Sequence, residues 1–451
     1  MNKMMKRALA LLLCLVMVMA MAACGGAPAQ QGGASAGNQG GSQSGSPIAR
    51  REAVTVSEPI TIDFWHTSSG DLAAELESQV NEFNANNPYG ITVKATSMGS
   101  YYQLLTKIQS SSGTSVMPDL VIAASGGIER LAEAGVLADV ASYVERDNFN
   151  MENIPESLRY YTEHYEGQVI EFPYLVSTAI IYYNKAYYPD GFPSTLEEWV
   201  EASKKITAEN PGVYGMALPL DTGYIQRPLL KSLGAPGLTT NNGTAPATLE
   251  DGTLEKLMTD WGTWIQDGHC MGLTVTDSTT NITNAFFSGK VAAFANSCAV
   301  MTSYIETAKK SGIDMGYASE VAYGGIAGAI GGGGLGVMST STDAEIAACW
   351  EFIKFLYEDE QVIDTHMVSG YLPITYTAAQ SEKVQSYWDE NPGNRVAFEQ
   401  LDWATYNEWS PYLQEWRDEI AAQFTAVLID GSVSPADAVR QLQRRAVITF
   451  S

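Results

Sequence analysis

The sequence is poor in cysteine and in positive charge, and both shortages exclude classes of function. Of its five cysteines, Cys14 and Cys24 lie in the N-terminal region, and Cys270, Cys298 and Cys349 form no CxxC pair. We therefore expect neither a disulfide framework nor a zinc site, but buried and unreactive thiols. The 26 Lys and Arg residues stand against 51 Asp and Glu residues, a net charge of −25. This acidity argues against nucleic acid as a partner.

Catalytic motifs are also scarce. The four histidines are scattered and form no HExxH motif. Residues 33–37 match GxSxG without the strand and helix that a nucleophile elbow needs. Residues 331–336 match GxGxxG, but a strand follows where a dinucleotide site needs a helix. We interpret these glycines as a turn where backbones pack closely, or as exposed N–H groups that face a small ligand. We expect no enzyme, cofactor or metal site.

One long apolar run stands at the N-terminus. Three positive charges precede the uncharged segment 8–21, and the sequence Met-Ala-Ala-Cys at 21–24 supplies a small-residue cleavage site. This pattern is typical of a secretory signal peptide over residues 1–23, and its apolar core is short for a membrane-spanning helix. The spacing resembles a bacterial lipobox, in which Cys24 carries the lipid. The alternatives are an ordinary signal peptide with a chance cysteine, or an uncleaved anchor.

Residues 24–56 consist mainly of Gly, Ser, Gln, Ala and Pro. Such a segment buries too little apolar surface to offset the entropy lost on ordering, so its composition predicts a flexible tether. A tether after a lipid-bearing cysteine would hold a folded body at some distance from the membrane. We therefore expect an extracytoplasmic protein that is anchored to the cell membrane by lipid on Cys24.

The body begins as alternating strands and helices. Apolar residues at 60–64, 91–95 and 120–123 follow strand patterns, and 72–83 and 102–109 follow helical spacing. This order predicts parallel α/β architecture with right-handed crossovers.

A second α/β body follows. A strand is expected at 178–183, and residues 194–197 and 342–345 each form a capping box before a helix. An apolar stripe runs along 416–427, and Pro435 marks the first turn of the last helix. Two bodies of this kind commonly hold a ligand cleft between them.

Five short motifs follow one another along this body: FWH at 64–66, PDL at 118–120, YYNK at 182–185, FSGKVAA at 287–293 and GYLP at 370–373. Their order and spacing resemble the family-1 extracellular solute-binding proteins of ABC importers, and within them the glycerol-3-phosphate-binding branch of the sugar binders. The resemblance implies a two-lobed periplasmic-binding-protein type II fold with a hinge and an interlobe cleft. The lobes would be 57–174 with 316–370, and 175–315 with 371–451.

The resemblance also implies ligand residues. Carried over position by position, they are Tyr101, Ser177, Ser297, Gly333 and Tyr371. Two positions depart from the branch: Ser125 stands where the branch has a Glu, and the C-terminal ligand Arg falls one residue from Arg417. The resemblance therefore leaves the chemical groups at both ends of the ligand undetermined.

Residue chemistry points to a sugar or polyol independently of the family. Aromatic rings with polar tips stack on sugar C–H surfaces and bond their hydroxyls, and the candidate rings are Trp65, Tyr101, Tyr224, Tyr371 and Trp409. For Trp409 a core or surface position is the favoured alternative. Arg417 could bind a phosphate through two hydrogen bonds or form a surface ion pair with Glu415 or Asp418. Arg227 would be the substitute cation if Arg417 points away from the cleft.

The sequence thus predicts a monomeric binding protein that closes around a sugar, polyol or glycerol phosphate and delivers it to ABC permease subunits. Lobe closure would do no chemistry on the ligand. A sensor that binds the same solute without transport, and a secreted carbohydrate-active enzyme, are the alternatives.

Overall fold

The computed structural model describes residues 48–111, 116–124, 127–159, 167–235, 237–238, 249–274, 278–406, 408, 410 and 412–450. All of these residues belong to one compact unit. The predicted signal peptide and Cys24, together with Ser125 and Trp409, lie outside the described residues.

The first part of the body is a parallel sheet, as the sequence predicts. It contains β1 (Ile60–His66), α2 (Gly70–Asn86), β2 (Ile91–Ser97), α3 (Tyr101–Ser111) and β3 (Leu120–Ala124). β1 lies between β2 and β3 and is parallel to both. We call these elements, with α4 (Gly127–Glu133), the first lobe.

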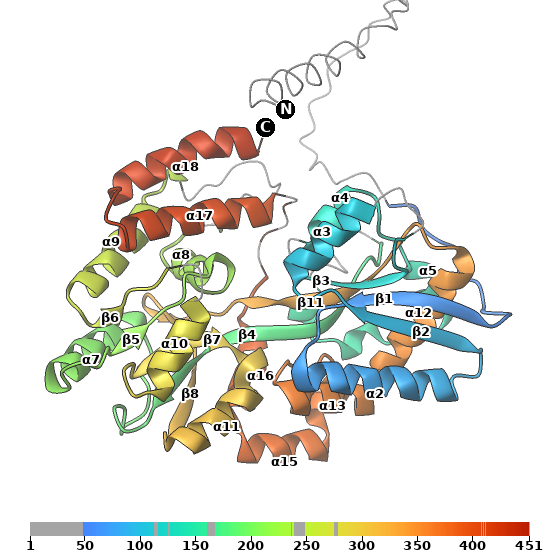
Figure 1. Ribbon diagram of the computed structural model, residues 1–451, viewed down its shortest axis with the longest axis horizontal. Helices are drawn as coiled ribbons and strands as arrows, with labels where there is room; N and C mark the ends of the chain where they lie inside the picture. The colour runs from blue at the N-terminus through green and yellow to red at the C-terminus, as the bar shows by residue number, and fades with distance from the viewer. Residues whose placement is uncertain are drawn as a thin grey trace, which may run out of the picture. The chain divides into compact units, whose positions relative to one another are not determined.

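Two long antiparallel strands connect this sheet to the rest of the molecule. β11 (Ile330–Val337) pairs with β3 on one side and with β4 (Phe172–Asn184) on the other. β4 continues beyond β11 to pair with β7 (Ala293–Ser297) and β8 (Met315–Ser319). Figure 1 shows β4 and β11 running between the two ends of the sheet. The glycine-rich segment is therefore a central strand, and its interpretation as a turn is wrong.

Beyond β7 lie the short strands β5 (Met216–Ala217) and β6 (Cys270–Met271), so the sheet order is β2-β1-β3-β11-β4-β7-β5-β6 with β8 paired to β4. A small hairpin of β9 (Val321–Ala322) and β10 (Gly325–Ile326) stands apart. The segment η3 (Thr222–Gln226) precedes α8 (Arg227–Ser232). We call β5, β6, β7, η3 and the helices around them the second lobe; these helices are α7 (Leu196–Glu209), α8, α9 (Thr253–Gln266), α10 (Ser278–Phe287), α17 (Leu413–Leu428) and α18 (Pro435–Thr449).

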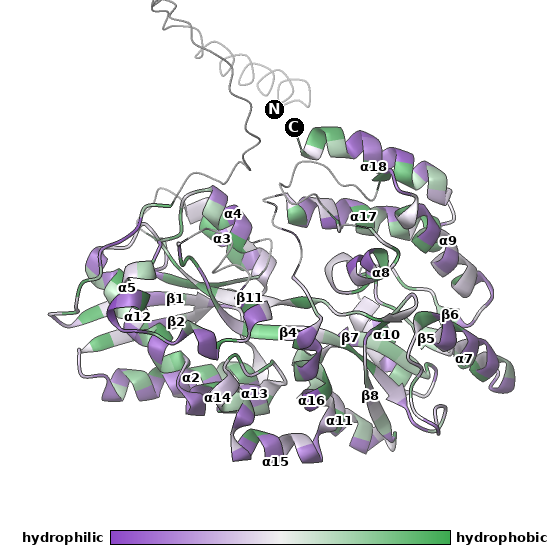
Figure 2. Ribbon diagram, turned by 180° about the vertical axis from the view of Figure 1, so that it is seen from behind, coloured by the Kyte–Doolittle hydropathy of each residue, from purple (hydrophilic) through white to green (hydrophobic). Residues whose placement is uncertain are grey.

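The remaining helices cover both faces of the sheet (Figure 1). Their bounds are α5 (Ala141–Arg146), α7 (Leu196–Glu209), α8 (Arg227–Ser232), α9 (Thr253–Gln266), α10 (Ser278–Phe287), α11 (Met301–Ser311), α12 (Asp343–Leu356), α13 (Asp359–Ser369), α14 (Tyr376–Gln380), α15 (Glu382–Glu390), α16 (Pro392–Glu399), α17 (Leu413–Leu428) and α18 (Pro435–Thr449). Polar and apolar residues alternate along these helices, whereas β4 is mainly apolar (Figure 2).

Helix starts follow the side-chain caps. Thr342 and Glu345 form the predicted reciprocal capping box of α12, and Ser434 caps α18 ahead of Pro435. At α7 the prediction is one residue early, because Thr195 is the cap and accepts from the Glu198 amide. Each cap satisfies an amide that the first turn would otherwise leave unpaired.

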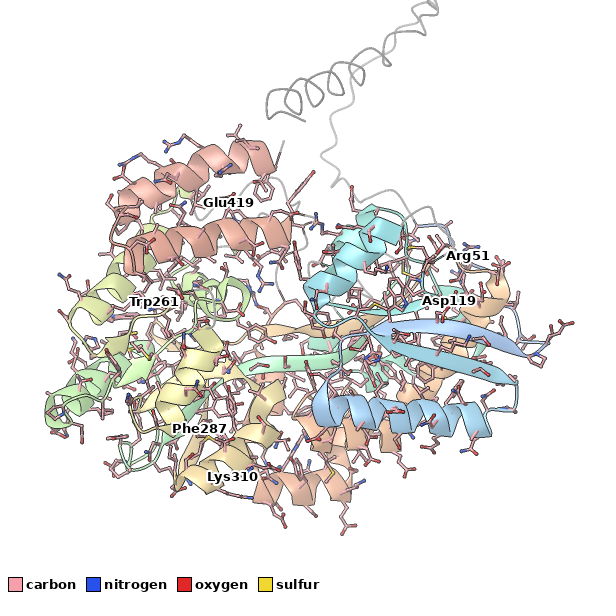
Figure 3. The ribbon with its side chains drawn as sticks, viewed as in Figure 1. Arg51, Asp119, Trp261, Phe287, Lys310 and Glu419 are labelled. Carbon is pink, nitrogen blue, oxygen red and sulfur yellow. The ribbon has the colours of Figure 1, made fainter. Side chains whose placement is uncertain are left out.

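Two apolar cores hold the body together. One surrounds β1, β3 and β11, and the other is built on large rings such as Trp199, Trp261 and Trp416. Trp261 of α9 packs on Phe424 of α17 with ring centroids 5.7 Å apart (Figure 3). Apolar side chains from Leu372 to Tyr406 join the first core, although the sequence assigned 371–451 to the second lobe. The lobe boundaries stay a prediction.

The three described cysteines, Cys270, Cys298 and Cys349, are buried and unpaired. Burial raises the pKa of the Cys270 and Cys298 thiols to about 12. These thiols are therefore protonated at neutral pH, which matches the inert role that the sequence predicts.

Candidate ligand-binding cleft

A cavity of about 450 Å³ lies between the two lobes. Both lobes and the strands that join them contribute to its wall, which consists of Ser100, Tyr101, Tyr102, Leu104, Leu105, Ala123, Ala124, Gly127, Ser177, Tyr224, Ser297, Gly331, Gly332, Tyr371, Gln414 and Arg417. We call it the tyrosine compartment. Its size is within the range of small-molecule sites.

The glycines of β11 make room for two of its tyrosines. A Cβ on Gly331 would lie 2.5 Å from the Tyr224 ring, and one on Gly333 would lie 2.7 Å from the Tyr101 hydroxyl. Residues two apart on a strand share one face of the sheet. At these two positions β11 therefore has no side chain on this face, and a tyrosine ring from each lobe lies against its backbone.

The tyrosine hydroxyls differ in their partners. Tyr224 Oη shares a hydrogen bond of 2.6 Å with Ser177 Oγ. The buried Tyr101 hydroxyl makes no hydrogen bond of normal distance and angle to the described residues, although the Thr67 and Tyr371 hydroxyls lie close to it. Burial raises the pKa of Tyr101 well above 10, and the nearby Tyr371 raises it further. Tyr101 is thus a protonated donor, and a buried hydroxyl of this kind gains when a ligand oxygen accepts from it.

Tyr371 is held by its backbone. Its amide donates to Ser369 Oγ over 3.1 Å, and its carbonyl lies 2.6 Å from His366 Nδ1. Burial raises the pKa of Tyr371 to about 12. The GYLP segment therefore fixes a protonated tyrosine at the edge of β4, where Leu372 donates to the Val176 carbonyl.

A second cavity of about 300 Å³ adjoins the first and is more polar. Its wall consists of Pro219, Leu220, Asp221, Thr222, Tyr224, Ile225, Ser278, Thr279, Asn296, Ser297, Gln414, Arg417, Asp418 and Ala421. We call it the polar compartment. It shares Tyr224, Ser297, Gln414 and Arg417 with the tyrosine compartment.

Arg417 lies at the junction and pairs with Asp221. The distance from Arg417 Nη2 to Asp221 Oδ1 is 3.3 Å, and the Arg417 side chain is 19 % exposed. The alternative of a surface ion pair with Glu415 or Asp418 is not found: Glu415 pairs with Arg130, and Asp418 accepts from Gln414. Arg417 therefore faces the cleft with a carboxylate already beside it.

Arg227, the substitute cation, is in the core. It is fully buried and donates to Thr405 Oγ1 over 2.9 Å. Neither compartment includes it. The substitute role was expected only if Arg417 points away from the cleft, and Arg417 lines both compartments. Arg227 is not placed for that role, because α8 turns its side chain inward.

The structure brings together Tyr101, Ser177, Tyr224, Ser297, Tyr371 and Arg417, which all line the tyrosine compartment. Gly333 lies beneath Tyr101. Trp65 does not join them: it is 6 % exposed within the first core and lines neither compartment. β1 is an inner strand, so neighbouring strands and helices cover the Trp65 ring. These residues remain proposals as ligand contacts.

The sequence analysis missed Gln414 and Asp221. Gln414 stands three residues before Arg417 and shares its helical face. Asp221 accepts from the Gly223 and Tyr224 amides at 3.1 and 3.0 Å. Asp followed two residues later by Gly is a turn signal that could have indicated it.

Comparison with known proteins gives a consistent result. The family model of bacterial extracellular solute-binding proteins matches residues 78–392. The sn-glycerol-3-phosphate-binding periplasmic protein UgpB of Salmonella typhimurium is 25 % identical over 366 residues, covering 76 % of this chain and 80 % of the relative. UgpB of Rhizobium meliloti is 24 % identical over 390 residues, covering 81 % and 88 %.

Solved structures share the fold. UgpB from Mycobacterium tuberculosis in complex with glycerophosphocholine has a TM-score of 0.75 at 21 % identity, covering 87 % of this chain and 98 % of that one. The GacH receptor of Streptomyces glaucescens, solved unliganded and with acarbose, has a TM-score of 0.74 at 20 % identity, covering 87 % and 99 %. The predicted two-lobed fold class is thereby confirmed.

The described residues include neither a membrane-spanning helix nor a cluster that could bind a metal. None of the described helices has the length and apolarity to cross a membrane. No cluster of three or more His, Cys, Asp or Glu in this part of the chain could hold a metal ion.

Proposed function

The chain belongs to the family of bacterial extracellular solute-binding proteins, and on this premise we propose that it is the substrate-binding component of an ABC importer. It captures a carbohydrate or a glycerol-3-phosphate-like solute in the interlobe cleft and delivers it to the permease. The two-lobe wall of the tyrosine compartment is the observation that carries this proposal.

The mechanism follows from that wall. Tyr101 belongs to the first lobe, Tyr224 belongs to the second, and both meet at β11. A solute that contacts both lobes binds the closed arrangement better than the open one, so it shifts the population toward closure. The permease then recognises the closed form and releases the solute by parting the lobes.

The sequence of the N-terminal region supports a location of the protein at the membrane. We propose that residues 1–23 direct export and that lipid on Cys24 anchors the protein. The tether would be residues 24–47, because residues 48–56, which the sequence assigned to it, pack on the folded body: Ile48 is buried in the first core, and the Arg51 amide donates to the Asp139 carbonyl. Mass spectrometry of the protein extracted from membranes tests this directly. A diacylglyceryl group on Cys24 is the expected result, and a mature N-terminus elsewhere would contradict it.

A ligand screen tests the binding function. The purified protein is heated with neutral oligosaccharides, polyols, sn-glycerol 3-phosphate and glycerophosphocholine, since a ligand that binds only the native state raises the Tm. We expect Tyr101→Phe to weaken the best ligand about three- to tenfold, the effect of one lost hydrogen bond. Tyr89→Phe, at an exposed ring outside both compartments, is the control and should change nothing. No Tm shift with any compound would contradict the proposed function.

A further inference from the structure

The two compartments differ in chemistry and meet at one ion pair. Among the described residues, Arg417 is the one charged residue that lines the tyrosine compartment, and the polar compartment adds the carboxylates of Asp221 and Asp418. The described lining of the two compartments therefore carries one cation and two carboxylates. A ligand that occupied both compartments would meet the shared residue Arg417, which pairs with Asp221.

Asp221 is held firmly in its place beside Arg417. Its Oδ1 accepts from the Gly223 amide at 3.1 Å, from the Tyr224 amide at 3.0 Å and from Arg417 Nη2 at 3.3 Å. The two amide bonds belong to the turn that opens η3. Asp221 therefore stays beside the guanidinium when another anion approaches, because leaving would unpair two backbone donors.

Arg417 is also confined. The Cβ position of Gly223 lies 2.7 Å from Arg417 Cζ, so the guanidinium packs on the backbone of the same turn. The Arg417 carbonyl accepts from Thr222 Oγ1 over 3.1 Å. The guanidinium and the carboxylate thus form one rigid unit at the junction of the compartments.

We propose that Asp221 is a specificity residue: by neutralising Arg417 it makes the cleft select a neutral solute of linked sugar rings over a phosphate ester. This inference rests on the proposed function and narrows its solute class. A phosphate monoester carries close to two negative charges at pH 7 and a phosphodiester carries one, and beside Arg417 either would meet the fixed Asp221 carboxylate. A like charge at this distance disfavours the ionised ligand.

Sugar hydroxyls can form hydrogen bonds with both members of the Arg417–Asp221 pair. A hydroxyl both donates and accepts, so adjacent hydroxyls can donate to Asp221 and accept from Arg417 without adding charge. Donors and acceptors continue along the polar compartment, where Ser278, Thr279 and Asn296 line the wall. The tyrosines of the other compartment offer ring faces for a second sugar.

Size favours the same class of solute. The compartments measure about 450 and 300 Å³ and are adjacent, with four lining residues in common. A three-carbon ester would leave much of this space unfilled, whereas linked rings reach from the tyrosines into the polar compartment.

Isothermal titration calorimetry with Asp221→Asn tests the proposal. Asparagine keeps an oxygen to accept the two amides and is an equally good cap, so the turn should persist. The matched control is Asp251→Asn, which removes the same charge from another turn, where Asp251 accepts from the Thr253 amide over 2.9 Å. The probes are a panel of neutral di- to tetrasaccharides, sn-glycerol 3-phosphate and glycerophosphocholine.

We expect the wild type and Asp251→Asn to bind a neutral oligosaccharide at least tenfold more tightly than either phosphate compound. Asp221→Asn should gain about tenfold in affinity for sn-glycerol 3-phosphate. Tighter wild-type binding of a phosphate compound, or no gain in Asp221→Asn, would overturn the specificity role and leave the transport function standing. Absence of binding to every probe would overturn both.

Discussion

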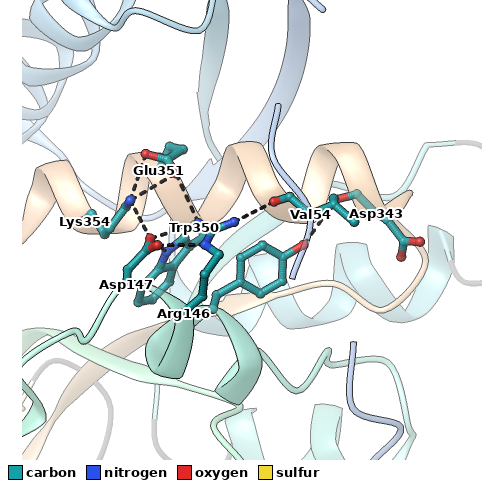
Figure 4. Close-up of polar contacts among 8 residues, drawn as sticks. Val54, Arg146, Asp147, Asp343, Trp350, Glu351 and Lys354 are labelled. Atoms are coloured by element: carbon teal, nitrogen blue, oxygen red, sulfur yellow. Dashed lines mark hydrogen bonds and ion pairs between the residues drawn. The ribbon is translucent and has the colours of Figure 1, made fainter. Parts of the chain in front are cut away.

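Asp147 shows how one carboxylate can join two elements far from the cleft. It follows α5 and accepts from Arg146 at 2.7 Å, and from Trp350 and Lys354 of α12, each also at 2.7 Å (Figure 4). Hydrogen bonds from Arg146, Lys354 and Trp350 hold the pKa of Asp147 well below its ordinary value. Charge-assisted bonds of this kind are the stronger ones in proteins.

We expect Asp147→Asn to lower the free energy of unfolding by about 1–2 kcal/mol at pH 7. Because the folded-state pKa is depressed, this stabilisation is present above the unfolded pKa and is lost as pH falls through the folded one. Urea unfolding at pH 7 and under acidic conditions measures the difference between the proteins, which should shrink with acid. Asp389→Asn, in an exposed pair with Arg395, should change stability little at either pH. An Asp147→Asn effect as small as that of Asp389→Asn would refute the network.

At the scale of single residues in the cleft, Arg417 is the instructive case. Sequence reasoning placed a cation near the ligand, but the neighbours of Arg417 on its own helix are not its partners. Its partner is Asp221, 196 residues away. The charge that the ligand meets is therefore set by a contact between η3 and α17, and spacing along the chain does not reveal it.

At the scale of elements, β11 decides the form of the cleft. It pairs with β3 of the first lobe and with β4, which continues toward the second lobe. A shift in pairing register separates Gly333 from Gly334, and Gly332 has a φ of +104°. Glycine tolerates this backbone and leaves space for the tyrosine rings.

We expect Gly331→Ala to displace the Tyr224 ring, since the new Cβ would stand 2.5 Å from it. The variant should bind ligand at least tenfold more weakly and lose about 1–3 kcal/mol of stability through overpacking. Calorimetry and thermal unfolding measure the two effects. Gly336→Ala on the same strand is the control, because its Cβ would meet the tip of the Leu137 side chain at 3.0 Å. Equal affinity loss in both variants would refute the proposed fit of Tyr224 against Gly331.

At the scale of the whole molecule, an ion pair joins the lobes beside the cleft. Arg130 of α4 lies 2.6 Å from Glu415 of α17, with side chains 31 % and 43 % exposed. Gly127 of α4, and Gln414 and Arg417 of α17, line the tyrosine compartment. The Arg130–Glu415 pair therefore forms only when the two walls of the cleft are close.

We expect Glu415→Arg to weaken ligand binding about two- to fivefold at low salt, the range of an exposed ion pair. The double variant Arg130→Glu/Glu415→Arg should restore binding, and 1 M salt should reduce the difference by screening. Calorimetry at the two salt concentrations measures this. Lys185→Glu, which breaks the exposed pair with Asp314, is the control. A loss that the double variant leaves unrepaired would contradict closure through this pair.

The sequence by itself determined the elements and the class of protein. Alternation and helical spacing predicted β1, α2, β2, α3 and β3 because these patterns reflect burial on one face, which is a local property. The order of short motifs identified the family. Six residues of the tyrosine compartment could be named in advance: Tyr101, Ser177, Ser297, Tyr371 and Arg417 from the ligand positions that the resemblance implies, and Tyr224 from the chemistry of its ring.

Only the tertiary structure decided which side chains meet. Burial of Trp65, the inward turn of Arg227 and the pairing of Arg417 with Asp221 all depend on elements packed from distant parts of the chain. The role of the β11 glycines also depends on distant elements, because the tyrosine rings that occupy the space above them come from α3 and η3. Local patterns report which face of an element is buried, whereas the partner on that face is chosen by the packing of the whole chain.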